Sequence, residues 1–353
     1  MKKIGSMIAM LAAIGALMTG CGQKATEAIQ QEGNEELLQV YTSFYPLYDF
    51  AKKVGGDKVN VVNLVPTGVE PHDYEPSARN VASLEEADVF VYNGAGLETW
   101  VDKVLATLET EDLLVVEATQ NIDLLTGHVH SHEEADHDHE EAHDEADHNH
   151  EEAHDEADHN HEEAHEEADH DHEAHHDHEG GTDPHVWTSI RNAKVEMENI
   201  KNAFVEADPE NKAYYEANYE RYAKEFDALD QQFADTLSQF ENRDIIVAHE
   251  AFAYLCQDYE LNQVGIEGIN ADSEPNPERM AEIIEFAKTK EIKVIFFEEL
   301  VSPKVAEAIA KEIGAQTMVL NPIEGLTEEQ IGAGEDYLSV MAQNLEALKV
   351  ALQ

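Results

Sequence analysis

Three histidines lie far apart in the sequence, each in a short segment of the kind that forms turns. His72 and His185 directly follow prolines, and His249 follows the apolar run Ile245-Ile246-Val247-Ala248. Imidazole is the commonest protein ligand for zinc-type metals and is mostly neutral near pH 7. A single histidine is more often an ordinary hydrogen-bonded side chain. Three in comparable places, with no other histidine outside one dense cluster, favour a single ordered metal site.

The other 17 histidines fall between His128 and His178, in a segment that repeats every eleven residues. From His132 onward it reads HEEADHDHEEA, HDEADHNHEEA, HDEADHNHEEA and HEEADHDHEA, and residues 128–179 hold 23 acidic side chains and no Lys or Arg. With few apolar side chains to offset the ordering entropy, residues 128–181 are expected to be a disordered acidic loop. Its His-x-His pairs are candidates for weak metal binding: His137, His139, His148, His150, His159, His161, His170 and His172. The alternative is a loop that only solvates the protein.

Apolar, β-branched runs alternate with helical patterns on both sides of this insertion. Strands are expected at residues 37–42, 59–65, 88–92, 113–116, 245–248, 261–266, 294–297 and 317–320. Helices are expected at residues 46–54, 77–86, 97–108, 252–259, 277–290, 303–313 and 328–352. Four strands alternating with helices, twice over, predict an α/β fold with two Rossmann-like lobes and parallel-rich four-stranded sheets.

One long helix should join the lobes. No glycine interrupts the segment from Pro209 to Gln239, and proline is well suited to a first helical turn. A single helix here would be rigid and roughly 45 Å long at 1.5 Å rise per residue. We therefore expect an N-terminal lobe over 36–207, a linker helix over 208–239 and a C-terminal lobe over 240–353.

These elements would bring the three histidines to one cleft. Ligands of open α/β sheets bind beyond the carboxyl ends of the strands, where two of the three histidines lie. A tetrahedral site needs a fourth ligand, and Glu324, shortly after the last strand, is the best-placed acid. Its rivals are Asn321, Asp73 and Glu250.

The chain begins with a pattern typical of secretion. Lys2 and Lys3 precede an apolar run over residues 8–18, which is too short to span a membrane comfortably. Thr19-Gly20-Cys21 then resembles the lipobox of bacterial lipoproteins, which implies that Cys21 is acylated. Residues 1–20 are thus expected to be a signal peptide and 21–35 a lipidated tether. The alternative is an ordinary signal peptide followed by an incidental cysteine.

Charge and cysteine content exclude some functions. The formal net charge of −54 argues against a nucleic-acid partner. After cleavage, Cys256 would be the only cysteine besides Cys21, so we expect it to be a small buried apolar residue rather than part of a disulfide.

Four segments together resemble the metal-binding solute-binding proteins of bacterial ABC importers, the zinc and manganese group known as cluster A-I. The segments are GVEPHDYEP at 68–76, DPHVW at 183–187, ADP at 207–209 with Tyr215 and Asn218, and HEAFAY at 249–254. A His-rich acidic loop before the DPHxW element is typical of the zinc branch. The chain departs from the pattern in two places: Thr188-Ser189-Ile190 lacks a common proline, and Cys256 has no partner.

The resemblance implies that His72, His185 and His249 coordinate the metal, with a carboxylate or water in fourth place. Pro322-Ile323-Glu324 looks like a sequence that some zinc members carry after the last strand. The implied protein is a lipid-anchored monomer on the extracytoplasmic face of the membrane, which passes Zn²⁺ to an ABC transporter permease and is not an enzyme. Two alternatives stay open: a cell-surface zinc hydrolase, although Ala253 breaks the HExxH motif, and a zinc store or adhesin scaffold.

Overall fold

The computed structural model describes residues 37–109, 112–126, 181–269 and 275–353. Leu37–Gln353 form one compact unit. The expected signal peptide, the tether with Cys21 and the histidine pairs of the acidic repeat lie outside the described residues. Within the described part of the chain, no helix is both long enough and apolar enough to cross a membrane.

The first sheet contains four parallel strands in the order β2-β1-β3-β4. The strands are β1 (Leu38–Thr42), β2 (Val59–Asn63), β3 (Val89–Tyr92) and β4 (Leu114–Glu117). The helices of this part of the chain are α1 (Tyr45–Gly55), α2 (Ala78–Leu84), α3 (Val101–Leu105) and α4 (Ile190–Ala207). Ser77 caps α2 by accepting a hydrogen bond from the Asn80 backbone N–H, which explains why the helix begins there.

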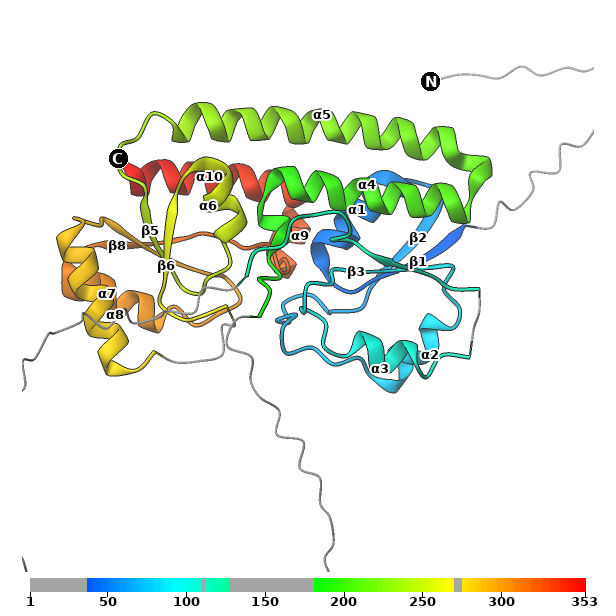
Figure 1. Ribbon diagram of the computed structural model, residues 1–353, viewed down its shortest axis with the longest axis horizontal. Helices are drawn as coiled ribbons and strands as arrows, with labels where there is room; N and C mark the ends of the chain where they lie inside the picture. Colours follow the sequence, from blue (N-terminus) through cyan, green and yellow to red (C-terminus); the bar gives the residue numbers. More distant parts are fainter. Residues whose placement is uncertain (1–36, 110–111, 127–180, 270–274) are drawn as a thin grey trace, which may run out of the picture. The chain divides into compact units, whose positions relative to one another are not determined.

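The second sheet repeats this arrangement, with four parallel strands in the order β6-β5-β7-β8. Its strands are β5 (Asp244–Val247), β6 (Asn262–Gly265), β7 (Val294–Phe297) and β8 (Gln316–Val319), and its helices include α6 (Ala253–Tyr259), α7 (Pro277–Thr289) and α8 (Lys304–Ile313). Both sheets are entirely parallel, which confirms the predicted α/β fold (Figure 1).

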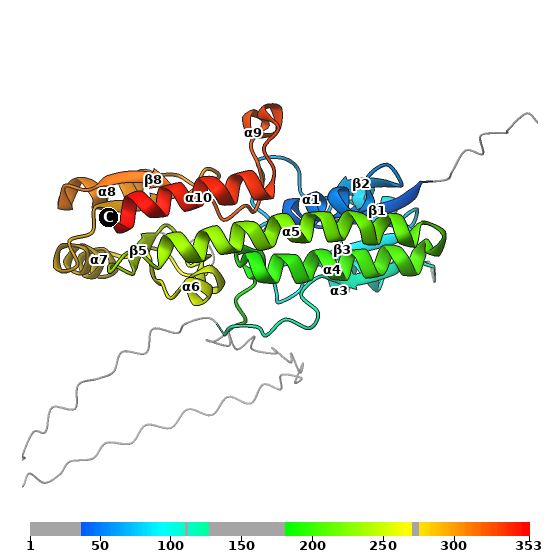
Figure 2. The same ribbon diagram turned by 90° about the horizontal axis from the view of Figure 1, so that it is seen from above.

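A long helix joins the two sheets, as the sequence predicted. Helix α5 (Lys212–Leu237) has 26 residues, about 39 Å at 1.5 Å rise per residue, and runs past both sheets (Figures 1 and 2). It begins later than expected, because Pro209–Asn211 form a separate 3-10 turn. The Asp208 carboxylate accepts hydrogen bonds from Asn211 and from the Tyr215 hydroxyl, which ties this turn to the first part of α5.

The prediction of one helix over residues 328–352 was wrong. The segment forms α9 (Glu328–Ala333) and α10 (Tyr337–Leu352), separated at Gly334, whose φ of +78° lies in the left-handed region that favours glycine. Asp336 then starts α10 with a capping box to Ser339. The break allows α9 to project away from α10 (Figure 2).

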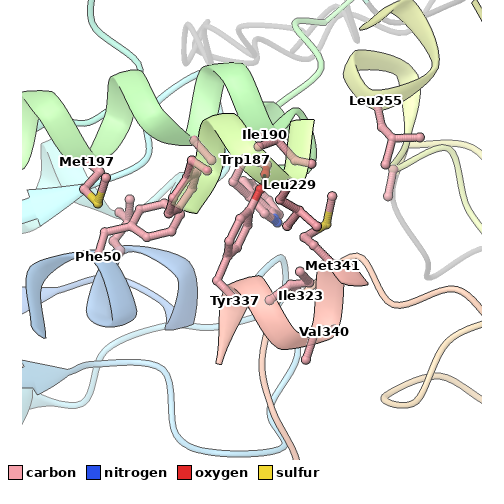
Figure 3. Close-up of a cluster of buried hydrophobic side chains, with 14 of the residues drawn as sticks. Phe50, Trp187, Ile190, Met197, Leu229, Leu255, Ile323, Tyr337, Val340 and Met341 are labelled. Carbon is pink, nitrogen blue, oxygen red and sulfur yellow. Dashed lines mark hydrogen bonds between the residues drawn. The ribbon is translucent and has the colours of Figure 1, made fainter. Parts of the chain in front are cut away.

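The two sheets share one hydrophobic core. Its buried side chains extend from Leu38 on β1 to Leu352 at the end of α10. Phe50 from α1 and Phe226 from α5 both pack against Tyr337, with ring centroids 5.0 and 5.3 Å away. Figure 3 shows Phe50 and Tyr337 meeting between α1, α4 and α10. The helices therefore hold the two sheets in one packed structure rather than connecting separate domains by a flexible hinge.

Candidate metal centre

Four side chains converge at one buried point: His72, His185, His249 and Glu324, each offering a ligand atom within 4.8 Å of the others. The Oε1 atom of Glu324 lies 3.4, 3.2 and 3.3 Å from the Nε2 atoms of His72, His185 and His249, respectively. His185 and His249 are fully buried, and the Glu324 residue is 2% exposed. Three imidazole nitrogens and one carboxylate oxygen are a donor set that can close a tetrahedral metal site.

The parallel topology explains this convergence. His72, His249 and Glu324 follow β2, β5 and β8, at the carboxyl ends of strands from both sheets. His185 precedes the short 3-10 helix η1 (Val186–Thr188), which leads into α4. The structure thus brings together the four residues that the sequence singled out.

Asn321, Asp73 and Glu250 were the alternatives to Glu324 as the fourth metal ligand. None of the three belongs to the four-residue group, and Asn321 has a supporting role instead. The Asn321 side chain accepts a hydrogen bond from the backbone N–H of Ile323 at 2.7 Å, and its own backbone is bonded to Asn344. It therefore supports the loop that carries Glu324.

That loop adopts a strained conformation. Ile323 has a φ of +62°, an outlier for a β-branched residue, and its side chain is buried. Such strain costs about 1–3 kcal/mol and persists only where the surroundings enforce it. Here the enforcing contacts are the bonds to Asn321 and Asn344 and a hydrogen bond from the Trp187 indole to the Pro322 carbonyl.

Two further carboxylates orient the histidines. Asp183 Oδ1 accepts from His185 Nδ1 at 2.8 Å, and Glu298 Oε1 accepts from His249 Nδ1 at 2.7 Å. With Nδ1 carrying the proton, Nε2 keeps its lone pair for the centre of the site. Among the described residues, no carboxylate plays this part for His72, which contacts His185 and Glu324 instead.

Neither supporting carboxylate is among the residues predicted from the sequence, although each carries a signal. Asp183 lies two residues before a proposed ligand, within DPHVW. Glu298 directly follows β7, at the same sheet edge as the ligands. Glu298 could therefore be predicted by its position at a strand end, in the same way as Glu324.

The charges at the site are strongly coupled. Burial lowers the pKa of His249, but Glu298 and Glu324 raise it by more, so the net pKa is well above the ordinary value. Burial likewise lowers the pKa of His185, but hydrogen bonds to Asp183 and Glu324 raise it by more, so the net pKa is above the ordinary value. Burial raises the pKa of Glu324, but the histidines, His249 foremost, hold it well below the usual range. The metal-free site therefore favours protonated imidazoles beside a charged carboxylate, and metal binding must release those protons.

A further acid lies next to this group. Glu70 Oε1 accepts from the His72 backbone N–H at 3.4 Å. Burial and the neighbouring Glu324 raise the pKa of Glu70 to about 9. Of these two neighbouring carboxyl groups, Glu70 therefore favours the protonated form and Glu324 the charged form in the metal-free protein.

The ends of the acidic insertion meet beside His185. Thr126 and Thr182 form an isolated antiparallel bridge, and the Asp183 backbone N–H donates to the Leu125 carbonyl at 2.9 Å. The Tyr254 hydroxyl joins the two segments, since it donates to the Asp183 carbonyl and accepts from the Leu125 N–H. The insertion thus leaves and re-enters the fold at one point, within three residues of a candidate ligand.

Comparisons with known proteins agree with this fold and site. Residues 40–351 match the family described as zinc-uptake complex component A, periplasmic. The zinc-binding lipoprotein AdcA of Streptococcus pneumoniae is 40% identical over 349 residues, which cover 99% of this chain and 61% of AdcA. The high-affinity zinc uptake system protein ZnuA of Bacillus subtilis is 37% identical over 352 residues, covering 100% of this chain and 99% of ZnuA.

The crystal structure of the Zn(II)-bound ZnuA-like domain of S. pneumoniae AdcA has a TM-score of 0.68 and 36% identity, covering 90% of this chain and 99% of that domain. The chain spans only 61% of the length of full AdcA, so the likeness does not extend over that whole protein. The family match nevertheless covers nearly all of the residues that form the two sheets and all four residues of the candidate site. This chain belongs to the zinc-uptake complex component A family.

Proposed function

We propose that this protein binds one Zn²⁺ ion through His72, His185, His249 and Glu324 outside the cytoplasmic membrane, and delivers it to the permease of an ABC transporter. The observation that carries the proposal is the convergence of four donor atoms within 4.8 Å, contributed by loops of both sheets. The names of the relatives, a zinc-binding lipoprotein and a zinc uptake protein, support the same cargo.

The donor set favours zinc over manganese. Imidazole nitrogens suit zinc, whereas manganese prefers sites richer in carboxylate and other oxygen ligands. The same set argues against a hydrolase, because a catalytic zinc needs an open coordination position for water, and Glu324 would fill it. In addition, Ala253 stands where HExxH would require a second histidine.

The attachment and the partner are part of the proposal. Acylation of Cys21 would hold the protein at the extracytoplasmic membrane surface as a monomer, with residues 21–35 as its tether. The word lipoprotein in the name of the AdcA relative supports this anchor. The permease would receive the Zn²⁺ ion when the zinc-loaded protein binds to it.

The histidine repeat has a separate role in this proposal. We expect its His-x-His pairs to bind several zinc ions weakly and to raise the local zinc concentration near the ordered site. The bridge between Thr126 and Thr182 supports this role, since it places both ends of the insertion close to His185. A loop that only solvates the protein would leave zinc capture unchanged when its histidines are replaced by asparagine.

The decisive experiment measures zinc stoichiometry and affinity in a protein lacking residues 129–179, with manganese as competitor. One tightly bound zinc should remain, and it should be lost in a His185→Ala variant of the same protein. Loss of nearly all zinc on the deletion alone would instead indicate a zinc store or an adhesin scaffold. Preference for manganese would contradict the assignment of the cargo. Ester or peptide hydrolysis that disappears with His185→Ala would favour the enzyme.

A further inference from the structure

One buried hydrogen bond joins the segments that carry His185 and Glu324. The indole Nε1 of Trp187, two residues after His185, donates to the carbonyl of Pro322, two residues before Glu324, at 2.6 Å. Trp187 is fully buried, so no water competes for this bond. His185 leads into α4 beside the first sheet, whereas Glu324 follows β8 of the second. The bond therefore fixes the spacing of two candidate ligands that come from opposite sides of the site.

A second hydrogen bond holds Trp187 in place. The hydroxyl of Tyr337, at the start of α10, donates to the Trp187 backbone carbonyl at 2.6 Å. Tyr337 is fully buried, and its ring is stacked on Phe226 with an interplanar angle of 7°. Figure 3 shows Tyr337 extending from α10 toward Trp187, with Phe50 packed close by. This packing leaves the hydroxyl little freedom to move away.

The backbone of Tyr337 is held by helix α1, which packs beside the first sheet. Its backbone N–H donates to Asp49 Oδ2 on α1 at 3.3 Å. Lys53 Nζ lies 2.7 Å from Asp49 and 2.8 Å from Asp336, the residue before Tyr337. A continuous set of contacts thus runs from α1 through Tyr337 and Trp187 to the Glu324 loop.

We propose that Tyr337 and Trp187 are positioning residues, which keep the Glu324 carboxylate where it can act as the fourth metal ligand. The proposal rests on the proposed function and adds a determinant of coordination that lies outside the ligand set. The Glu324 loop needs such support, because the left-handed Ile323 would relax if its restraints loosened. Ligand geometry must hold within about 0.5 Å, so a small relaxation would let water replace the carboxylate.

The test compares Tyr337→Phe with Tyr259→Phe in the full-length chain. Tyr259 is a matched control: it is 5% exposed, and its hydroxyl donates to Asp230 on α5 rather than to Trp187. Co²⁺, added below one equivalent so that the tightest site fills first, reports coordination through its visible absorption. We expect the wild type and Tyr259→Phe to give the intense bands of four-coordinate Co²⁺. In Tyr337→Phe, where water replaces the carboxylate, the positions and intensities of the Co²⁺ bands should differ from those of the wild type, and zinc binding should be about tenfold weaker.

A double-mutant cycle separates positioning from a general loss of stability. If Tyr337 acts through Glu324, the effect of Tyr337→Phe on zinc affinity should disappear in a Glu324→Gln background. Additive effects, or a Co²⁺ spectrum in Tyr337→Phe identical to that of Tyr259→Phe, would overturn the inference. If Tyr337→Phe does not fold, Trp187→Phe takes its place in both measurements. The proposed function fails on a different result: a wild-type Co²⁺ spectrum that His185→Ala leaves unchanged.

Discussion

Glu298 offers a sharp test of how the site is built, because it contacts a candidate ligand without being one. Its Oε1 lies 2.7 Å from His249 Nδ1, and both residues are nearly or fully inaccessible to solvent. Glu298→Gln replaces the carboxylate by a neutral acceptor of the same shape. Glu298→Leu removes the acceptor and leaves the buried Nδ1–H without a partner.

The expected loss of zinc affinity follows from the role of the hydrogen bond between Glu298 and His249. Loss of an outer partner of a metal-bound histidine costs about 10- to 100-fold in affinity, equivalent to about 1.4–2.7 kcal/mol. Because Gln still accepts from Nδ1–H, we expect about a tenfold loss for Glu298→Gln, and about a 100-fold loss for Glu298→Leu, which no longer specifies the tautomer.

The assay is competition for zinc against a chelator of known affinity, with zinc below one equivalent. Glu312→Gln is the matched control for the charge change. Glu312 lies exposed on α8, where its carboxylate is 3.4 Å from the exposed Lys288 and is not part of the four-residue site. The pH dependence of the zinc affinity gives a second test. Glu298 also raises the pKa of His249 in the metal-free protein, so the variant suffers less competition from protons. The affinity deficit of Glu298→Gln should therefore shrink as the pH falls.

Equal zinc affinities for the three variants, in proteins with unchanged circular dichroism, would refute the idea that Glu298 orients His249. A deficit that grew at low pH would contradict the stated sign of the pKa shift. Either result would leave the four-residue site itself in place.

Three other predictions follow from the described contacts. Because the pKa values of His185 and His249 are raised in the folded state, the stability that they contribute is present below about pH 6.5 and is lost as the pH rises through the folded values. The melting temperature of the metal-free protein should thus fall above about pH 6.5, while the increase caused by zinc grows. Asp336→Ala should lower the free energy of unfolding by about 1–2 kcal/mol in urea, through the lost cap of α10 and the lost contact with Lys53, whereas Asp336→Asn should keep the cap. In a Cys21→Ser variant, Cys256 should react with a thiol reagent only on unfolding, because burial raises the pKa of its thiol, and rapid reaction of the native protein would contradict this.

The candidate site could be predicted from the sequence where a residue type that binds metals follows the end of a predicted strand. The eight strands could be predicted because short β-branched runs alternate with helical patterns, and residues 294–297 match β7 at both ends. His72, His249 and Glu324 could then be placed at one edge, since parallel strands present their carboxyl ends together. These predictions need only local patterns and a topology rule.

Features that depend on contacts between distant residues could not be predicted in this way. The left-handed conformation of Ile323 depends on a local hydrogen bond to Asn321 and on contacts of this loop with two distant residues, Asn344 and Trp187. The local sequence does not show the two distant contacts. The break at Gly334 is a weaker case, since a glycine within a helical pattern is often tolerated. The role of Tyr337 depends on α1 and α5 as much as on α10, so no periodicity within α10 reveals it.

The Thr126–Thr182 bridge has an evolutionary consequence. It joins the two ends of the insertion, so the contacts that hold these ends together do not require any particular length of chain between them. The entropy of closing a flexible loop grows only with the logarithm of its length, about 0.6 kcal/mol for each doubling. Replication slippage could therefore add or remove whole eleven-residue copies with almost no penalty to folding. The number of histidines between Thr126 and Thr182 is thus free to change, while the four residues of the ordered site stay where they are.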